Sequence, residues 1–228
     1  MNKQEVLQAI KGGLIVSCQG LEHEPMHSSF IMQRFAVSAM QGGAVGIRAN
    51  TVEDILEIKK EVSAPVIAII KRDYPDSEVY ITPTTKEVAE LGDIGVEIIA
   101  IDATNRPRPN GQTLAEIVEF ARKNYPNALL MADTSCYDEC VNAEKLGFDF
   151  IGTTMRGYTP YTKGVKLPDY KFIKKLVKTL NTPIIAEGGI STPAELKKVM
   201  KLKVHCAVVG GAITRPQNIT KSFTDAIK

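Results

Sequence analysis

The 228-residue sequence predicts a closed (β/α)8 barrel, also called a TIM barrel, and three observations support this fold class. Eight short and almost continuously apolar runs recur along the chain, as expected for strands that are buried on both faces. Amphipathic stretches of helical length separate these runs. The units average about 28 residues each, and no low-complexity segment interrupts them. Such alternation requires right-handed crossovers and a parallel sheet, and eight units are the number that closes a barrel.

The expected strands are each about five or six residues long and rich in β-branched residues. In chain order they are Leu14–Cys18, Ala44–Arg48, Val66–Lys71, Glu97–Asp102, Ala128–Asp133, Phe148–Thr153, Pro183–Glu187 and His205–Val209. The clearest helices have apolar residues at three-to-four spacing and begin with threonine before an acidic residue. They are Thr51–Val62, Thr113–Asn124 and Thr192–Met200.

An open doubly wound sheet is the alternative architecture, and it normally carries G-x-G-x-x-G after its first strand. The first expected strand instead continues into Ser17-Cys18-Gln19-Gly20, so that motif is missing. We therefore expect one barrel domain over residues 1–228, with its chemistry at the C-terminal ends of the strands.

Composition narrows the class of partner. The chain has 28 Lys and Arg against 26 Asp and Glu, a net charge of +2 that is too small for a nucleic-acid or membrane-binding surface. A small anionic ligand is compatible with this charge. No run of about 18 apolar residues occurs, and the apolar stretch near the N-terminus is too short for a signal sequence. The four cysteines are widely spread, and we expect them to be reduced in a soluble, cytoplasmic protein.

Six expected strands end in, or are followed by, a side chain that can bind ligands or transfer protons. These residues are Gln19, Arg48, Lys71, Asp102, Asp133 and Glu187. Barrel strands also need polar residues where they meet solvent, which is the structural alternative for each residue taken alone. Three of these charges directly follow the apolar runs VIAII, ALLMA and PIIA. Desolvating a charge there costs free energy, so a charge at such a position indicates a function. We therefore interpret Lys71, Asp133 and Glu187 as candidate catalytic residues.

Paired glycines follow the last two expected strands, at Gly188–Gly189 and Gly210–Gly211. Glycine lets main-chain N–H groups approach an anion closely, and a helix that starts there adds the positive end of its dipole. The loops after strands seven and eight are the usual phosphate site of this fold. Arg215 lies four residues beyond Gly211 and can add a forked pair of hydrogen bonds to the same phosphate. The structural alternative is that the glycines only make tight turns.

Two motifs are set aside. His23 to His27 matches H-E-x-x-H, which places two zinc ligands on one helix face, but Pro25 would break that helix and no third ligand follows at a plausible spacing. Cys136 and Cys140 lack the C-x-x-C spacing of redox pairs, so we interpret them as packing residues. We predict no metal site.

The sequence resembles the bacterial N-acylglucosamine-6-phosphate 2-epimerase family, and the similarity spans essentially the whole chain. The stretches that carry the resemblance are GLIVSCQ, GIRANT, PVIAIIKRDYPDSEVYITPT, IDATNRPRPNG, MADTS, FDFIGTTMRGYT, PIIAEGGISTP and VVGGAITRPQNIT. The resemblance implies interconversion of N-acetylmannosamine 6-phosphate and N-acetylglucosamine 6-phosphate, a step in sialic acid breakdown, without a cofactor.

The resemblance also implies a role for individual residues. By similarity, Lys71 is the acid and base, while Glu187 and Asp133 assist and orient it. The remaining matches hold the sugar and its acyl group (Arg48, Gln19) or bind the phosphate (Gly189, Gly210, Gly211, Arg215).

Epimerisation at C2 requires removal of a weakly acidic proton next to the C1 carbonyl group of the open-chain sugar. A lysine serves as the base only when its amine is neutral, so the pKa must fall from about 10.4 to roughly 7 to 8 through burial or nearby cations. Arg48 and Arg72 are candidates for those cations. Two alternatives stay open: Lys71 forming a Schiff base, as in aldolase-type barrels, and a phosphosugar-binding barrel without activity. We also expect a homodimer.

Overall fold

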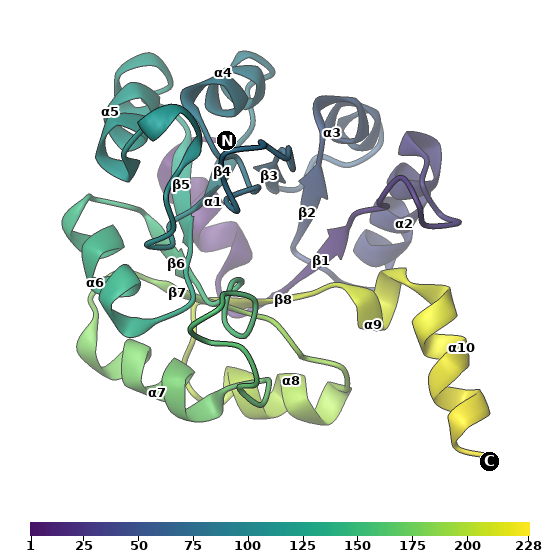
Figure 1. Ribbon diagram of the computed structural model, residues 1–228. Coiled ribbons are helices and arrows are strands. Elements are labelled where there is room, and N and C mark those ends of the chain that lie inside the picture. Colours follow the sequence, from purple (N-terminus) through teal and green to yellow (C-terminus); the bar gives the residue numbers. More distant parts are fainter.

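The computed structural model describes all 228 residues and forms a closed barrel of eight parallel strands, with neighbours paired in chain order (Figure 1). The strands are β1 (Leu14–Cys18), β2 (Gly46–Asn50), β3 (Val66–Ile69), β4 (Ile98–Asp102), β5 (Leu129–Asp133), β6 (Phe150–Gly152), β7 (Ile184–Glu187) and β8 (Cys206–Val209). Because β1 also pairs with β8, the sheet has no free edge. The predicted (β/α)8 barrel is confirmed.

Helices surround the barrel, and each strand is joined to the next by at least one of them (Figure 1). They are α1 (Lys3–Ile10), α2 (Ser29–Gln41), α3 (Val52–Lys59), α4 (Thr85–Asp93), the 3-10 turn η1 (Pro109–Gly111), α5 (Leu114–Asn124), α6 (Tyr137–Lys145), α7 (Tyr170–Thr179), α8 (Pro193–Met200), α9 (Gly211–Thr214) and α10 (Pro216–Asp225). The predicted start signals are confirmed, because Thr51, Thr113 and Thr192 each cap a helix by accepting a hydrogen bond from a main-chain N–H group.

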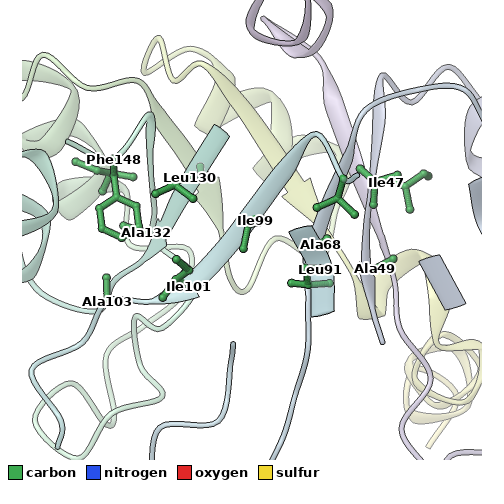
Figure 2. Packing of buried hydrophobic residues seen from close by; sticks show 14 of the residues in the cluster. Ile47, Ala49, Ala68, Leu91, Ile99, Ile101, Ala103, Leu130, Ala132 and Phe148 are labelled. Atoms are coloured by element: carbon green, nitrogen blue, oxygen red, sulfur yellow. The ribbon is translucent and has the colours of Figure 1, made fainter. Parts of the chain in front are cut away.

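Residue alternation along the strands sorts side chains into two layers. Ile47 and Ala49 of β2 point outward, as do Leu130 and Ala132 of β5, and they join a cluster of 39 buried residues between the sheet and the helices (Figure 2). Their neighbours point into the barrel, where a second cluster of 15 buried residues includes two side chains of α1. This period of two therefore places Arg48 on the inner face of the barrel.

Two strand boundaries differ from the prediction in ways that matter for the site. β3 ends at Ile69, so Lys71 lies beyond the ladder, where it forms an isolated antiparallel bridge with Ile81. The Asn50 side chain accepts a hydrogen bond from the Lys71 N–H group at 2.8 Å, which ends the pairing with β2. Arg48 is the middle residue of β2 rather than its last, because that strand runs two residues further than expected.

The C-terminal helix α10 differs from the others. None of its residues is buried, Phe223 is 72% exposed, and the helix extends away from the barrel (Figure 1). No helix of the protein combines the length and the apolar character that crossing a membrane requires. All four cysteines are unpaired, and three of them are buried.

Candidate active site

A cavity of about 730 Å³ opens at the C-terminal ends of the strands. Nine of the ten predicted site residues line it, namely Gln19, Arg48, Lys71, Glu187, Gly188, Gly189, Gly210, Gly211 and Arg215. The tenth, Asp133, is completely buried beneath the cavity. Because the C-terminal ends of all strands meet at one face of the barrel, side chains up to about 200 residues apart in the sequence lie in one cavity.

Arg48 lies at the centre of a buried charge cluster built on three strands. Its guanidinium binds Asp133 of β5 through two contacts, with Nη2 2.5 Å from Oδ2 and Nη1 3.1 Å from Oδ1. Nη1 is also 3.1 Å from Oε2 of Glu187 on β7. Arg48 is 1% exposed, so the pairing is shielded from solvent. One cation thus faces two carboxyl groups, of which only Glu187 lines the cavity.

Thr154 connects the same two carboxyl groups and was missed by the sequence analysis. Its Oγ1 lies 2.6 Å from Asp133 Oδ1 and 3.0 Å from Glu187 Oε2. A hydroxyl has one hydrogen and serves one of these acceptors fully. Burial raises the pKa of Glu187 against the opposing effect of the Arg48 cation, and the nearby Asp133 charge raises it further. The Thr154 hydroxyl therefore bridges the two carboxyl groups that flank Arg48.

Lys71 lines the cavity with a strongly perturbed amine. Burial lowers its pKa from 10.5 to about 8, and the cations of Arg48 and Arg215 act in the same direction. Of the two cations that the sequence suggested, Arg48 has this effect and Arg72 does not. The Arg72 guanidinium is turned away and is bound by two carboxylates of α4, with Nη2 3.0 Å from Glu90 Oε2.

The two glycine pairs serve the cavity in different ways. Gly189 has a positive φ of 68°, and a Cβ atom there would lie 2.3 Å from the Leu167 Cβ, so only glycine fits. At Gly210 a Cβ atom would lie 3.4 Å from the Ser17 Cβ, an ordinary van der Waals contact, so close packing does not require glycine there. The main-chain N–H groups of Gly188, Gly189 and Gly210 donate no hydrogen bond within the protein. They are therefore available to an anion at this end of the cavity.

Two buried polar atoms of the side chains have no partner within the protein, Gln19 Oε1 and Arg48 Nε. Both belong to residues that line the cavity and that the sequence predicted to hold the substrate. The Gln19 side chain is fixed at its other end, where Nε2 donates to Ser17 Oγ at 2.8 Å. Since buried polar groups are usually paired, a ligand with its own donor and acceptor atoms is the expected partner.

Other strand-end and motif residues lie outside the cavity lining. Asp102 is fully buried and binds Arg106 of its own loop, with Nη2 2.6 Å from Oδ2, so it organises that loop. The H-E-x-x-H segment is a loop rather than a helix, and His27 Nδ1 contacts the Gly20 carbonyl oxygen at 3.1 Å. Glu24 within that segment binds Arg215 through both carboxylate oxygens.

The chain matches a known protein family over most of its length. A family model described as "Putative N-acetylmannosamine-6-phosphate epimerase" matches residues 32–228, which is most of the chain. The chain belongs to this epimerase family. The family that the motifs resembled is thereby confirmed.

Members of the epimerase family align with the chain over almost its whole length. A protein of Clostridioides difficile (strain 630) named "Putative N-acetylmannosamine-6-phosphate 2-epimerase" is 57% identical over 223 residues, which cover 98% of this chain and 99% of the relative. The relative of the same name from Staphylococcus haemolyticus is 55% identical over 221 residues, 96% of this chain and 99% of its own.

The fold comparison agrees with the family assignment. The solved structure of the N-acetylmannosamine-6-phosphate 2-epimerase from Clostridium perfringens superposes with a TM-score of 0.93 at 55% identity, covering 96% of this chain and 95% of that chain. The thiamine phosphate pyrophosphorylase from Pyrococcus furiosus shares the fold at 17% identity with a TM-score of 0.61.

Proposed function

We propose that the protein interconverts N-acetylmannosamine 6-phosphate and N-acetylglucosamine 6-phosphate by removing and returning the proton on C2, without a cofactor. The observation that carries this proposal is the position of Lys71, an amine with a pKa lowered to about 8, in a cavity shared with the Arg48–Glu187 pair. Membership in the epimerase family supports the choice of substrate.

Lys71 is the base in this proposal. Its neutral amine takes the C2 proton of the open-chain sugar, and the electron pair of the C2–H bond moves onto the C1 carbonyl oxygen to give an enolate. Glu187 lines the same cavity, and burial raises its pKa, which favours the protonated form that can donate a hydrogen bond to that developing oxyanion. Return of a proton to the opposite face of C2 completes the epimerisation and restores the carbonyl group.

The two ends of the substrate have separate partners. The unpartnered Gln19 Oε1 suits the N–H group of the acetamido substituent, and the unpartnered Arg48 Nε suits a sugar oxygen. The 6-phosphate is held by main-chain N–H groups of Gly188, Gly189, Gly210 and Gly211 and by the Arg215 guanidinium. All five residues line the cavity, which supports this placement.

Incubation with N-acetylmannosamine 6-phosphate in D₂O tests the proton transfer. We expect N-acetylglucosamine 6-phosphate to form without added cofactor and to carry deuterium at C2, as read by NMR. Lys71→Ala is expected to abolish both exchange and epimerisation. Product without solvent deuterium at equilibrium, or near-normal turnover by Lys71→Ala, would contradict the mechanism.

The two alternatives are separated by simple controls. Borohydride added to the enzyme and substrate would trap a covalent adduct on Lys71 if a Schiff base forms, and we expect no adduct. A barrel that only binds phosphosugars would show no turnover of either epimer at any pH.

Three further features belong to the same proposal. We assign the reaction to sialic acid breakdown in the cytoplasm, the compartment in which phosphorylated sugars are found and cysteines stay reduced. A homodimer is supported by α10, a helix of 10 residues with none of them buried. Light scattering on the purified protein tests the dimer, and Phe223→Asp on the exposed face of α10 should shift it toward the monomer if α10 forms the contact.

A further inference from the structure

An ion pair joins the first and last loops at the mouth of the barrel. Glu24 lies in the loop between β1 and α2, and Arg215 lies between α9 and α10. Arg215 Nε is 2.5 Å from Glu24 Oε1, and Nη2 is 3.1 Å from Oε2. The Glu24 side chain is 12% exposed and that of Arg215 is 24% exposed, so the pair is partly shielded from solvent. Its geometry is the forked arrangement in which both carboxylate oxygens are used.

This pairing decides which edge of the Arg215 guanidinium stays free. Nε and Nη2 are occupied by Glu24, whereas Nη1 donates to no protein acceptor. Nη1 lies 3.6 Å from the place where a Cβ atom on Gly211 would stand, so the free edge faces the second glycine pair. A guanidinium carries five N–H donors in a rigid plane, and holding one edge fixes the direction of the other.

Glu24 is itself held in place from several sides. Its Oε2 accepts a hydrogen bond from the Leu21 N–H group at 3.0 Å, and its own N–H group donates to the Leu21 carbonyl oxygen at 2.8 Å. Gln217 adds a longer contact of 3.4 Å to Oε1. The hydrogen bond from Arg215 lowers the pKa of Glu24, so the carboxylate is charged at neutral pH. Glu24 is thus held by contacts from both of the loops that it joins.

We propose that Glu24 is a positioning residue, which holds Arg215 so that its Nη1 edge points at the phosphate of the substrate. The inference rests on the proposed function, since it takes the glycine pairs and Arg215 as the phosphate site. It also gives a use to the H-E-x-x-H segment, whose glutamate acts on an arginine rather than on a metal-bound water.

Removing the Glu24 carboxylate has two opposing effects. A negative charge leaves the neighbourhood of the phosphate, which favours binding, but solvent at the cavity mouth screens this effect. Arg215 also loses its fixed direction, and an N–H···O bond weakens steeply when its angle and distance change. We expect the loss of direction to dominate, so that the phosphate binds less well.

Steady-state kinetics with N-acetylmannosamine 6-phosphate tests the proposal. Glu24→Ala should raise KM by about tenfold while kcat changes less than about twofold, the size expected for a lost charge-assisted hydrogen bond at the phosphate. Glu24→Gln keeps one acceptor and should show a smaller rise. The inhibition constant of inorganic phosphate should rise in parallel, because this probe reads the anion site without the sugar.

Glu22→Gln is the matched control, since it removes the same charge from an exposed position in the same loop. Arg215→Ala supplies the second control. In that background Glu24→Ala should add almost nothing to KM, because in this proposal the carboxylate affects phosphate binding through the arginine. Glu22→Gln should leave both constants within about twofold of the unmodified protein.

Three results would overturn the role of Glu24: an unchanged KM in Glu24→Ala, a lowered KM, or the same rise in the Arg215→Ala background. A failure of the proposed function is distinguishable, because the unmodified protein would then not turn over the phosphosugar at all. The dissociation constant of inorganic phosphate, measured by calorimetry on Glu24→Gln and the unmodified protein, still reads the position of Arg215 in that case. If Glu24→Ala fails to fold, Glu24→Gln carries the same comparison.

Discussion

Raising the pH from 6.5 to 9.5 is the perturbation that probes Lys71 most directly. Burial and the cations of Arg48 and Arg215 lower its pKa from 10.5 to about 8. At pH 7 a base with that pKa is neutral in about one molecule in eleven, against about one in three thousand for an unperturbed lysine. The environment of the cavity therefore raises the population of active base by roughly 300-fold.

The expected profile follows from these fractions. Because only the neutral amine accepts a proton, kcat/KM should rise about tenfold between pH 7 and pH 9 and then level off. The substrate phosphate loses its second proton near pH 6, so it is fully charged over most of this range. Coupled assay of N-acetylglucosamine 6-phosphate at each pH gives the profile, with C2 deuterium exchange as an independent reading. A flat profile, or a midpoint near 10.5, would refute the assignment of the base.

Three other changes test neighbouring parts of the site. Gly211→Val places a branched side chain where even a Cβ atom would already contact Arg215 at 3.5 Å, so KM for the phosphosugar should rise about tenfold or more, while the slow turnover of unphosphorylated N-acetylmannosamine should change little. Thr154→Val removes the hydroxyl between two carboxyl groups and should lower kcat by about tenfold or more, and Thr154→Ser should restore most of it. Lys71→Met removes a half-buried amine and should raise the melting temperature at pH 7. The lowered pKa means that burying the ammonium group costs most stability below about pH 8 and none above about pH 10.5. The gain in melting temperature should therefore shrink between these two pH values. Equal gains at both ends of the window would show that desolvation of the charge is not the cause.

The barrel was predictable because its signals are local and repeated. Continuous apolar runs and threonine caps depend on short stretches of sequence, and every predicted strand was found within a few residues. The cavity-lining residues were predictable for a related reason, since a parallel barrel brings all C-terminal strand ends to one face. A charge that ends a buried run therefore marks the site even when its partners are distant.

Those signals did not predict which side chains the charged residues at the strand ends would contact. Asp102 and Asp133 end similar apolar runs and pair in register, yet one binds Arg106 of its own loop and the other binds Arg48 across the barrel. Thr154 follows a strand whose end carries no charge, so nothing marked its hydroxyl, although two consecutive threonines after β6 were a weak signal. Glu24 lies 191 residues from its arginine, a separation that only the closed barrel resolves.

The distribution of charge in the site links base activation to phosphate binding. Arg48 and Arg215 both lower the pKa of Lys71, while the carboxyl groups that would raise it are paired with these same arginines. A bound phosphate brings negative charge to Arg215 and offsets part of its effect on the amine. The pKa of Lys71 should therefore be higher in the enzyme–substrate complex than in the free enzyme. Because kcat reports the complex and kcat/KM reports the free enzyme, the midpoint of the kcat profile should lie at higher pH. In Arg215→Ala the two midpoints should move closer together, and an unchanged separation there would mean that the phosphate acts on Lys71 by another route.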